Sequence, residues 1–583
     1  MYTHIKSVQI LISLMKQYNV KHIVLSPGTR NTPLAHSVET DDYFTCYSIV
    51  DERSAGYFAL GIAETLDVPV AVSCTAATAT CNYFPAIKEA YERKLQLIAL
   101  TADQESKTRF QMADQSIDQI NMFHGFVRCA IDIPKVTEQR DEWYCNRCIN
   151  EAFQAMSHHR KGPVQINYHM SYSLEELSTF KVECLPQTRK IERYEGPMDW
   201  EPVAKVLKQK NRVLVIAASD YIENESLRKS LRDFTDKYNC VVLADTFSNV
   251  RSYDCDRIIC PNTLGDVLNG EEIEELCPDL ILTFGNVYYS TMKFLLLQYS
   301  KRVEHWQIAL DGIINDGYRC LTRIYECRPE KFFEEVNTYS DGENDGVYSS
   351  LWENQLNRLV YPDLKFTHFE VIRQLCEKLP KNSILHTSVL DSIRISNYVP
   401  MHPTVRCFAN IGADGIDGAL STLLGQASVD DKLSVLLIGD LSLLYDMSAL
   451  LTNIPSNVRI LVINNYAGAE FHKNFGLERI KTLNRHIAAG HTTKIQQCMA
   501  LSNASYLKAE NSQELEDALG IFLQNNEAPI ILEVFTDAAT DAQVLKEYWK
   551  INKHPGKTTI KQRIYNIIGD ANWNRLKHVL GRG

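Results

Sequence analysis

Short apolar runs alternate with longer amphipathic segments along this chain, which predicts repeated parallel βαβ units. Near the start, Val8, Leu11, Ile12 and Met15 recur at the 3.6-residue period of a helix. The first set of predicted strands covers residues 22–26, 69–74, 95–101 and 163–168. Short strands separated by helices are typical of a parallel sheet covered by helices.

The same pattern occurs twice more. After a looser stretch at 171–200, strands are predicted at 213–218, 240–245, 280–285 and 305–310, and then at 383–388, 404–409, 433–440, 458–465 and 529–535. Residues 337–346 are acidic, contain glycine and lack apolar periodicity, so we expect a linker or exposed loop there. The sequence therefore predicts an α/β protein whose domains, each a parallel sheet flanked by helices, span 1–180, 190–345 and 350–548, with a tail at 549–583.

Composition supports a large globular protein and excludes some classes. The 583 residues are 45% hydrophobic and 23% charged, which suits several cores. A formal charge of −11 argues against a nucleic-acid partner. Polar residues interrupt the first 18 positions and no membrane-length apolar run occurs, so we expect a cytoplasmic protein with no membrane partner.

Cysteine use and the tail add two smaller expectations. Sixteen cysteines are scattered rather than clustered, which favours reduced thiols. The single CxxC, Cys145 to Cys148, has no second pair at a zinc-like distance and is interpreted as two thiols on one helical face. The basic tail at 549–583 is expected to dock on the protein's own oligomer, with a partner-binding arm as the alternative.

Two polar pairs end consecutive predicted strands of the third set. Gly439-Asp440 closes the strand at 433–440, and Asn464-Asn465 closes the strand at 458–465. Mg²⁺ prefers oxygen ligands and usually keeps phosphate oxygens among them. The pattern predicts a site for one divalent ion and a diphosphate. Each pair alone is also an ordinary turn dipeptide.

A second constellation lies in the first hundred residues. Asp51 and Glu52 follow a β-like run and precede a helix rich in small residues. Functional groups of open α/β sheets gather at such strand ends. The alternative for Glu52 is a solvated acid at a helix start, where the helix dipole favours negative charge.

Several strings together resemble the thiamine-diphosphate enzymes, and within them most closely the menaquinone-pathway synthases of 2-succinyl-5-enolpyruvyl-6-hydroxy-3-cyclohexene-1-carboxylate (SEPHCHC). They occur in the order of that family and are LSPGTRNTPLA (25–35), VDERSAGYFALG (50–61), TAATATCNYFPA (75–86), LTAD (100–103), DQSIDQ (114–119), ANIGADGIDGALST (409–422), LLIGDLSLLYD (436–446) and VINNYAG (462–468). The resemblance implies a pyrimidine-binding first domain, a non-catalytic Rossmann-like central domain and a diphosphate-binding third domain.

It also implies thiamine diphosphate and Mg²⁺ as cofactors. Glu52 would be the catalytic carboxylate against N1′ of the aminopyrimidine, and the metal ligands would be Asp440, Asn465 and the backbone carbonyl of Ala467. The other implied cofactor-binding positions are Pro27, Thr75, Asn82, Gly415, Ile416, Gly439 and Ser442, and the implied substrate-binding positions are Thr29, Arg30, Gln115 and Arg394. For Thr75 and Asn82, turn or helix capping is an equal alternative. The spacing of Gly412, Gly415 and Gly418 does not fit the dinucleotide motif.

The chain departs from the synthases at substrate-side positions. Ile411 and Gln104 stand where the family has arginine, Leu390 where it has serine, and Asp114 where it usually has asparagine. An aliphatic side chain cannot make the bidentate bonds that a guanidinium gives a carboxylate. We therefore expect a synthase-like carboligase whose 2-oxo acid donor is smaller or less anionic than 2-oxoglutarate, pyruvate being the simplest.

Other functions stay open at this point. They are a genuine SEPHCHC synthase acting on 2-oxoglutarate and isochorismate, a simple 2-oxo acid decarboxylase (a lyase), and a non-catalytic cofactor-binding subunit. His472 and His124 are candidate proton donors, with surface-loop histidines as the commoner alternative. The resemblance implies a dimer or a dimer of dimers, because the domains that hold Glu52 and Asp440 face each other across a subunit boundary in that family.

Overall fold

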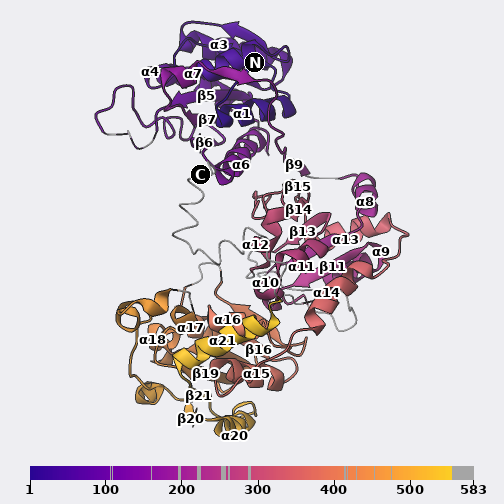
Figure 1. Cartoon of the computed structure of the whole chain (residues 1–583), viewed down its shortest axis with the longest axis vertical. Helices are drawn as coiled ribbons and strands as arrows, with labels where there is room; N and C mark the ends of the chain where they lie inside the picture. The colour runs from indigo at the N-terminus through magenta and orange to yellow at the C-terminus, as the bar shows by residue number, and fades with distance from the viewer. Residues whose placement is uncertain are drawn as a thin grey trace. The chain divides into compact units, whose positions relative to one another are not determined.

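The computed structural model describes residues 1–554 except 106, 108, 110, 159–160, 195–197, 219–224, 251–257, 260–262, 286–290, 412–414, 417, 428–429, 452 and 474–475. The chain forms two compact units. The first comprises Met1–Tyr194 with Gly312–Ile324, and the second comprises Glu195–Asp311 with the chain from Tyr325 onward. Figure 1 shows the helices and strands of each unit.

The first unit contains a six-stranded parallel sheet in the order β3-β2-β4-β5-β7-β6. Its strands are β2 (His22–Leu25), β3 (Thr45–Ser48), β4 (Val70–Cys74), β5 (Leu97–Asp103), β6 (Ala130–Ile133) and β7 (Val164–His169). Its helices are α1 (Lys6–Gln17), α2 (Thr32–Glu39), α3 (Glu52–Leu66), α4 (Thr78–Asn82), α5 (Phe84–Arg93), α6 (Gln139–Ala155) and α7 (Leu174–Leu177). The short strands β1 (Tyr2–Thr3) and β8 (Phe180–Val182) pair antiparallel.

Helices cover both faces of this sheet, which explains its nearly continuous apolar strands. The apolar residues of α1 and α6 pack with Ile23, Ile98 and Ile166 on one face. Those of α3 and α5 pack with Val24 and Val72 on the other. Successive strand residues thus enter opposite cores, because side chains alternate across a strand.

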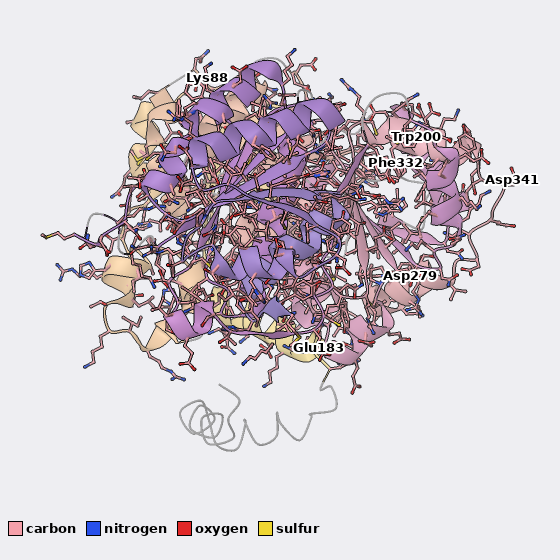
Figure 2. All side chains as sticks on the ribbon, turned by 90° about the horizontal axis from the view of Figure 1, so that it is seen from above. Lys88, Glu183, Trp200, Asp279, Phe332 and Asp341 are labelled. Carbon is pink, nitrogen blue, oxygen red and sulfur yellow. The ribbon has the colours of Figure 1, made fainter. Side chains whose placement is uncertain are left out.

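The second unit contains parallel strands in the order β12-β11-β10-β13-β14. They are β10 (Val213–Ala217), β11 (Cys240–Ala244), β12 (Ile258–Ile259), β13 (Leu280–Phe284) and β14 (Glu304–Ile308); β9 (Glu192–Tyr194) and β15 (Leu321–Tyr325) fall wholly or mostly within the first unit. The helices are α8 (Glu201–Lys208), α9 (Glu225–Lys237), η2 (Thr246–Ser248), α10 (Leu264–Val267), α11 (Gly270–Glu275), α12 (Met292–Leu296), η3 (Leu297–Tyr299), α13 (Pro329–Thr338) and α14 (Val347–Asn357). Trp200, which precedes α8, and Phe332, on α13, meet edge to face with ring centroids 5.6 Å apart; both residues are labelled in Figure 2.

The segment at 337–346 is largely the exposed loop that its composition predicted, since residues 341–343 and 345 are exposed, but three of its polar side chains, Asn337, Ser340 and Asn344, are buried. Asn337 belongs to the end of α13 and is buried. Asn344 is also buried, and its amide Nδ2 donates to the backbone carbonyls of Thr235 and Cys240. A polar side chain can be buried when it satisfies backbone groups, which polarity along the sequence does not reveal.

The third sheet also lies in the second unit and has the order β17-β16-β18-β19-β21-β20, all parallel. Its strands are β16 (Ile384–Thr387), β17 (Arg406–Ala409), β18 (Ser434–Gly439), β19 (Val458–Asn464), β20 (Ser505–Ala509) and β21 (Ile530–Phe535). Its helices are α15 (His368–Lys378), α16 (Asp391–Ser396), α17 (Ala419–Ala427), α18 (Asp440–Tyr445), η4 (Met447–Leu451), α19 (Glu470–Lys473), η5 (Leu477–Arg479), η6 (Leu483–Ile487), η7 (Ile495–Leu501), α20 (Ser512–Phe522) and α21 (Ala538–Asn552).

Hydrogen bonds join the two sheets of the second unit. The side chain of Asn249 donates to the carbonyl of Cys407 at 2.9 Å and accepts from its amide at 2.8 Å. The Tyr398 hydroxyl donates to the partly buried carboxylate of Asp266. These long-range bonds explain why strands far apart in the sequence belong to one compact unit.

The predicted fold class is confirmed, since helix-flanked parallel sheets recur along the chain. The domain boundaries remain predictions. Most of the basic tail, from residue 555 on, lies outside the described residues, whereas Trp549 to Asn552 form the end of α21. None of the helices that the structure describes has both the length and the apolar character needed to cross a membrane.

Candidate functional site

Asp440 and Asn465 lie at the carboxyl ends of the neighbouring strands β18 and β19, as their spacing predicted. Asp440 is 3% exposed, and its Oδ2 accepts backbone hydrogen bonds from Asn465 at 3.1 Å and Tyr466 at 2.8 Å. Burial raises the pKa of the Asp440 carboxyl above its ordinary value, although these backbone N–H groups and nearby His491 oppose that shift. A bound cation would favour the ionised carboxylate.

The donor set at this edge fits Mg²⁺. A carboxylate, an amide oxygen and the carbonyl of Ala467 are all hard oxygen ligands, and the ion usually completes its octahedron with phosphate oxygens and water. Among the described residues, no three His, Cys, Asp or Glu side chains gather into a metal-binding group. The residues present therefore suit an ion that arrives with a diphosphate rather than an all-protein cage.

The predicted diphosphate-binding positions surround this edge. A Cβ added at Gly439 would meet no atom within 4 Å, so the backbone there leaves open space beside Asp440. The hydroxyl of Ser442, on α18, donates to the backbone carbonyl of Ile416, which ties the Gly415-Ile416 segment to the predicted metal site. Ile416 and Gly415 are both partly exposed, as positions that meet a bound cofactor must be before it binds.

Arg394, the predicted donor-side arginine, lies on α16 and is already paired with two carboxylates. Its Nη1 lies 2.7 Å from Oδ1 of Asp391 and 2.8 Å from Oε2 of Glu470. Lys473, 4% exposed, pairs with the same two carboxylates. The four side chains carry two charges of each sign and form one compact ion cluster.

In the first unit, Glu52 is the first residue of α3 and is half-buried. Its charge acts on two buried groups, Cys74 at the end of β4 and Tyr83 between α4 and α5. Burial is the main cause that raises the pKa of Cys74 to about 12 and that of Tyr83 well above its usual range, and the charge of Glu52 adds to both shifts. Glu52 thus lies close to the end of β4 and to the start of α5, near Cys74 and Tyr83.

The loop that carries Pro27 and Thr29 lies against Thr75. A Cβ at Gly28 would come within 2.4 Å of the Thr75 Cβ, so only glycine fits between them. Thr75 is half-buried directly after β4, and its carbonyl accepts from Thr80 Oγ1 at 3.3 Å. The Thr75 carbonyl thus helps to hold the start of α4, while the role of its side chain stays a prediction. Asn82 ends α4 and is exposed.

Arg30 and Gln115 are brought together by the fold. Arg30 Nη1 donates to Gln115 Oε1 at 2.5 Å, across 85 residues of sequence. Gln115 has φ +48°, in the left-handed region, within the loop that follows β5. Their contact places two of the three predicted substrate-binding residues of this unit at one point, the third being Thr29.

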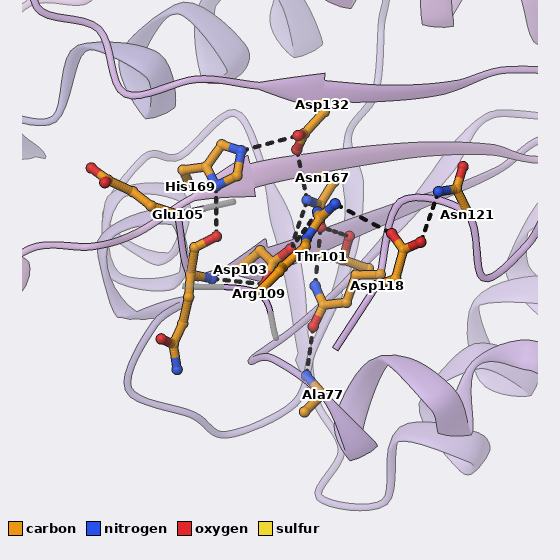
Figure 3. Close-up of polar contacts among 12 residues, drawn as sticks. Ala77, Thr101, Asp103, Glu105, Arg109, Asp118, Asn121, Asp132, Asn167 and His169 are labelled. Carbon is orange, nitrogen blue, oxygen red and sulfur yellow. Dashed lines mark hydrogen bonds and ion pairs between the residues drawn. The ribbon is translucent and has the colours of Figure 1, made fainter. Parts of the chain in front are cut away.

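A partly buried polar network holds the base of that loop (Figure 3). Asn167 donates to Asp103 at 3.0 Å and to Asp132 at 2.7 Å, and Asp103 and Asp118 flank the Arg109 guanidinium at 3.4 and 3.2 Å. Gln119 accepts from the Ala77 amide at 2.5 Å, which links the loop to the turn before α4. The network fixes both ends of residues 103–119 while leaving Gln115 exposed.

The structure also shows where the residues lie that differ from those expected of the synthases. Gln104 donates from Nε2 to the carbonyl of Asp114 at 2.6 Å, so both substituted positions of this loop contact each other. Leu390 precedes α16 with φ +66°, and Ile411 is buried in the core of the third sheet. The side chain of Ile411 is thus a packing group in this protein.

Of the candidate acids, His472 lies on α19 and its Nε2 is buried without a hydrogen-bond partner. His124 is exposed in a turn. Of these two histidines, only His472 therefore has a buried ring nitrogen.

Sequence reasoning missed Asp541, Glu533 and Glu470, which contact Asn465, Asn464 and Arg394 respectively. It also missed Lys473, which pairs with the carboxylates that surround Arg394. Two of these residues carry a recognisable signal. Asp541 falls on the same helical face as Ala538, Ala542 and Leu545, and Glu533 lies inside an otherwise apolar strand. An acid on an apolar face must be satisfied by specific partners, which marks it for attention.

Comparisons with known proteins show which family the chain resembles along nearly its whole length. The N-terminal TPP-binding domain of thiamine pyrophosphate enzymes matches residues 5–122. The 2-succinyl-5-enolpyruvyl-6-hydroxy-3-cyclohexene-1-carboxylate synthase of Bacteroides thetaiotaomicron is 34% identical over 568 residues, covering 94% of this chain and 99% of that protein. The synthase of Flavobacterium johnsoniae is 30% identical over 571 residues, again covering 94% and 99%.

These matches confirm the family resemblance and the predicted cofactors, thiamine diphosphate and Mg²⁺. They cover nearly the whole chain rather than one domain. We conclude that the chain belongs to the SEPHCHC synthase family of thiamine-diphosphate enzymes.

Proposed function

We propose that this protein is a thiamine-diphosphate- and Mg²⁺-dependent carboligase that decarboxylates a 2-oxo acid without a second carboxylate and transfers the remaining unit to an acceptor. When bound, the cofactor supplies the carbanion chemistry that the protein's side chains lack. Asp440 and Asn465 would hold the metal end, and Glu52 would hold the aminopyrimidine. The active protein would be a dimer or tetramer.

The observation that supports a smaller donor is the engagement of Arg394. Its Nη1 contacts both Asp391 and Glu470, and Lys473 contacts the same two carboxylates. A dicarboxylate donor would have to displace a carboxylate from this cluster or accept its repulsion. A hydrogen bond to a charged group is worth about 1.5–3 kcal/mol, which converts to roughly a 10- to 150-fold preference.

A substrate panel tests the proposal. The purified protein, with thiamine diphosphate and Mg²⁺, is given pyruvate, 2-oxobutyrate or 2-oxoglutarate, each with and without isochorismate. We expect CO₂ release from the monocarboxylates to have a kcat/KM at least about tenfold above that for 2-oxoglutarate. Mass spectrometry of the products separates carboligation from plain aldehyde release.

A second candidate is the SEPHCHC synthase reaction itself, with 2-oxoglutarate and isochorismate. It is favoured by the identity of 34% to the Bacteroides thetaiotaomicron synthase over nearly its full length. Efficient turnover of that pair in the same panel would establish this candidate and sink the smaller-donor proposal. No turnover with any donor would point to a binding subunit.

A further inference from the structure

The side-chain amide of Asn465 is held between two different neighbours. On one side, Nδ2 donates to Asp541 Oδ2 at 3.0 Å. On the other, Oδ1 accepts from the backbone N–H of Ala467 at 3.3 Å. The amide oxygen therefore lies on the side of Ala467, whose carbonyl is the third predicted ligand.

This orientation matters because only the oxygen atom of a side-chain amide, and not its NH₂ group, binds cations. The oxygen of Asn can ligate Mg²⁺, whereas its NH₂ group only donates. Rotating the amide by half a turn would present NH₂ to the ion. A carboxylate placed against Nδ2 opposes that rotation, since two acceptors would then meet.

Asp541 is itself fixed firmly. It is fully buried in the first turn of α21, and its Oδ1 accepts from the backbone N–H of His368 at 2.8 Å, at the start of α15. The His368 imidazole lies 3.1 Å away, and Thr536 donates to Oδ2 at 2.7 Å. A carboxylate near two helix N-termini is favourably placed by their dipoles.

We propose that Asp541 is a positioning residue for the metal ligand Asn465, which it holds with the amide oxygen directed to the ion. Outer partners of metal ligands commonly act in this way, and their loss typically weakens metal binding on the order of 10- to 100-fold. The inference depends on the family's cofactors and not on which donor the protein uses.

The test measures metal affinity rather than turnover. The protein saturated with thiamine diphosphate is titrated with Mn²⁺, and free Mn²⁺ is followed by electron paramagnetic resonance. The asparagine of Asp541→Asn has one acceptor oxygen and one NH₂ group. If its oxygen accepts from Asn465 Nδ2, its NH₂ faces the backbone N–H of His368, and if it is turned round, its NH₂ faces Asn465 Nδ2. We expect the variant's Kd for Mn²⁺ to rise on the order of 10- to 100-fold.

Thr536→Val is the matched control. It removes the other donor to the same Asp541 oxygen but leaves the Asn465 contact intact, so Mn²⁺ affinity should stay within about threefold of the unmodified protein. The thermal midpoint of each cofactor-free variant reports damage to the fold separately. If Asp541→Asn does not fold, Asp541→Ser, which leaves room for water, replaces it with the same expectation.

Two results would overturn the proposal. One is a folded Asp541 variant that binds Mn²⁺ as tightly as the unmodified protein. The other is an equal loss of affinity in Thr536→Val, which would mean that the orientation of Asn465 is not what Asp541 controls. Neither result bears on the donor, so failure here is distinguishable from failure of the proposed reaction.

Discussion

The guanidinium of Arg459, on β19, donates its Nε hydrogen to the backbone carbonyl of Phe522, the last residue of α20, at 2.5 Å. Arg459 is 1% exposed, and its other hydrogen bonds also go to backbone carbonyls, those of Ser456, Val458 and Gln524. The last carbonyls of a helix lack partners within it. A buried arginine thus supplies the end of α20 with donors.

Arg459→Met should therefore loosen α20. The buried carbonyls would lose their donors, at about 1–3 kcal/mol for a group left unsatisfied. Hydrogen exchange at the α20 amides should accelerate, and the urea midpoint of the second unit should fall.

Arg373→Met is the comparison for that change. Arg373 pairs with Glu370 and Glu377 on the partly exposed face of α15. Such surface pairs contribute about 0–1 kcal/mol. If the two variants lowered the urea midpoint equally, the hydrogen bonds of Arg459 to backbone carbonyls would stabilise the protein no more than a surface ion pair does.

Glu470→Gln should alter donor preference, if the proposed function is correct. The change removes one of the two carboxylates on Arg394 and leaves the cluster with a net positive charge. The ratio of kcat/KM for 2-oxoglutarate to that for pyruvate should rise by about tenfold, which corresponds to 1.4 kcal/mol. Competition assays with both donors present give this ratio directly.

Glu377→Gln controls for the loss of any arginine partner. It frees Arg373 on α15 from one contact and should leave the donor ratio unchanged. An unchanged ratio in Glu470→Gln would contradict the role given to the Arg394 cluster.

His368 should make stability depend on pH. Burial lowers the pKa of its imidazole, but the charge of Asp541 outweighs burial and the net shift is upward from 6.5. A raised native pKa gives stability that is fully present below about pH 6.5 and lost as pH rises through the native value. His368→Gln should thus cost more stability at about pH 6 than at about pH 9 in urea melts.

His386 should behave with the opposite sign. Burial is the main cause that lowers the pKa of this β16 side chain to about 4. Because the unfolded chain binds the proton more tightly, stability is lost as pH falls from about 6.5 to about 4. His386→Gln should remove that loss. Relative to the unmodified protein, this variant should therefore gain stability as pH falls, whereas His368→Gln should lose it.

Ala77 should gain from replacement by glycine. Ala77 has φ +63° and ψ −115° in the turn between β4 and α4, a conformation that costs a non-glycine residue about 1–3 kcal/mol. Glycine adopts it without strain but loses about 0.5–1 kcal/mol of chain entropy. We expect Ala77→Gly to raise the thermal midpoint. Ala76→Gly is the control, and it should lower the midpoint because Ala76 does not have a positive φ.

Leu390 occupies the equivalent turn before α16, with φ +66° and ψ −122°. Two strained turns at strand-to-helix junctions thus lie beside predicted site residues in separate sheets. A fall in the midpoint for Ala77→Gly would mean that the Cβ contacts of Ala77 outweigh its backbone strain.

The sequence determined the elements and brought together the two residues of the predicted metal site. Apolar runs at 433–440 and 458–465 became β18 and β19, and Asp440 and Asn465 reached one edge because parallel strands end together. The same periodicity gave the opening helix and the sheets of both units. These features depend on local order, which a pattern of residue types records.

Only the tertiary structure decided which side chains meet. Asp541 contacts Asn465 across 76 residues, and it contacts His368 across 173. Arg394 meets Glu470 because α16 and α19 pack at the same place. Such partners depend on how helices seat on a sheet and on which buried polar groups still need hydrogen bonds, and neither leaves a periodic trace in the sequence.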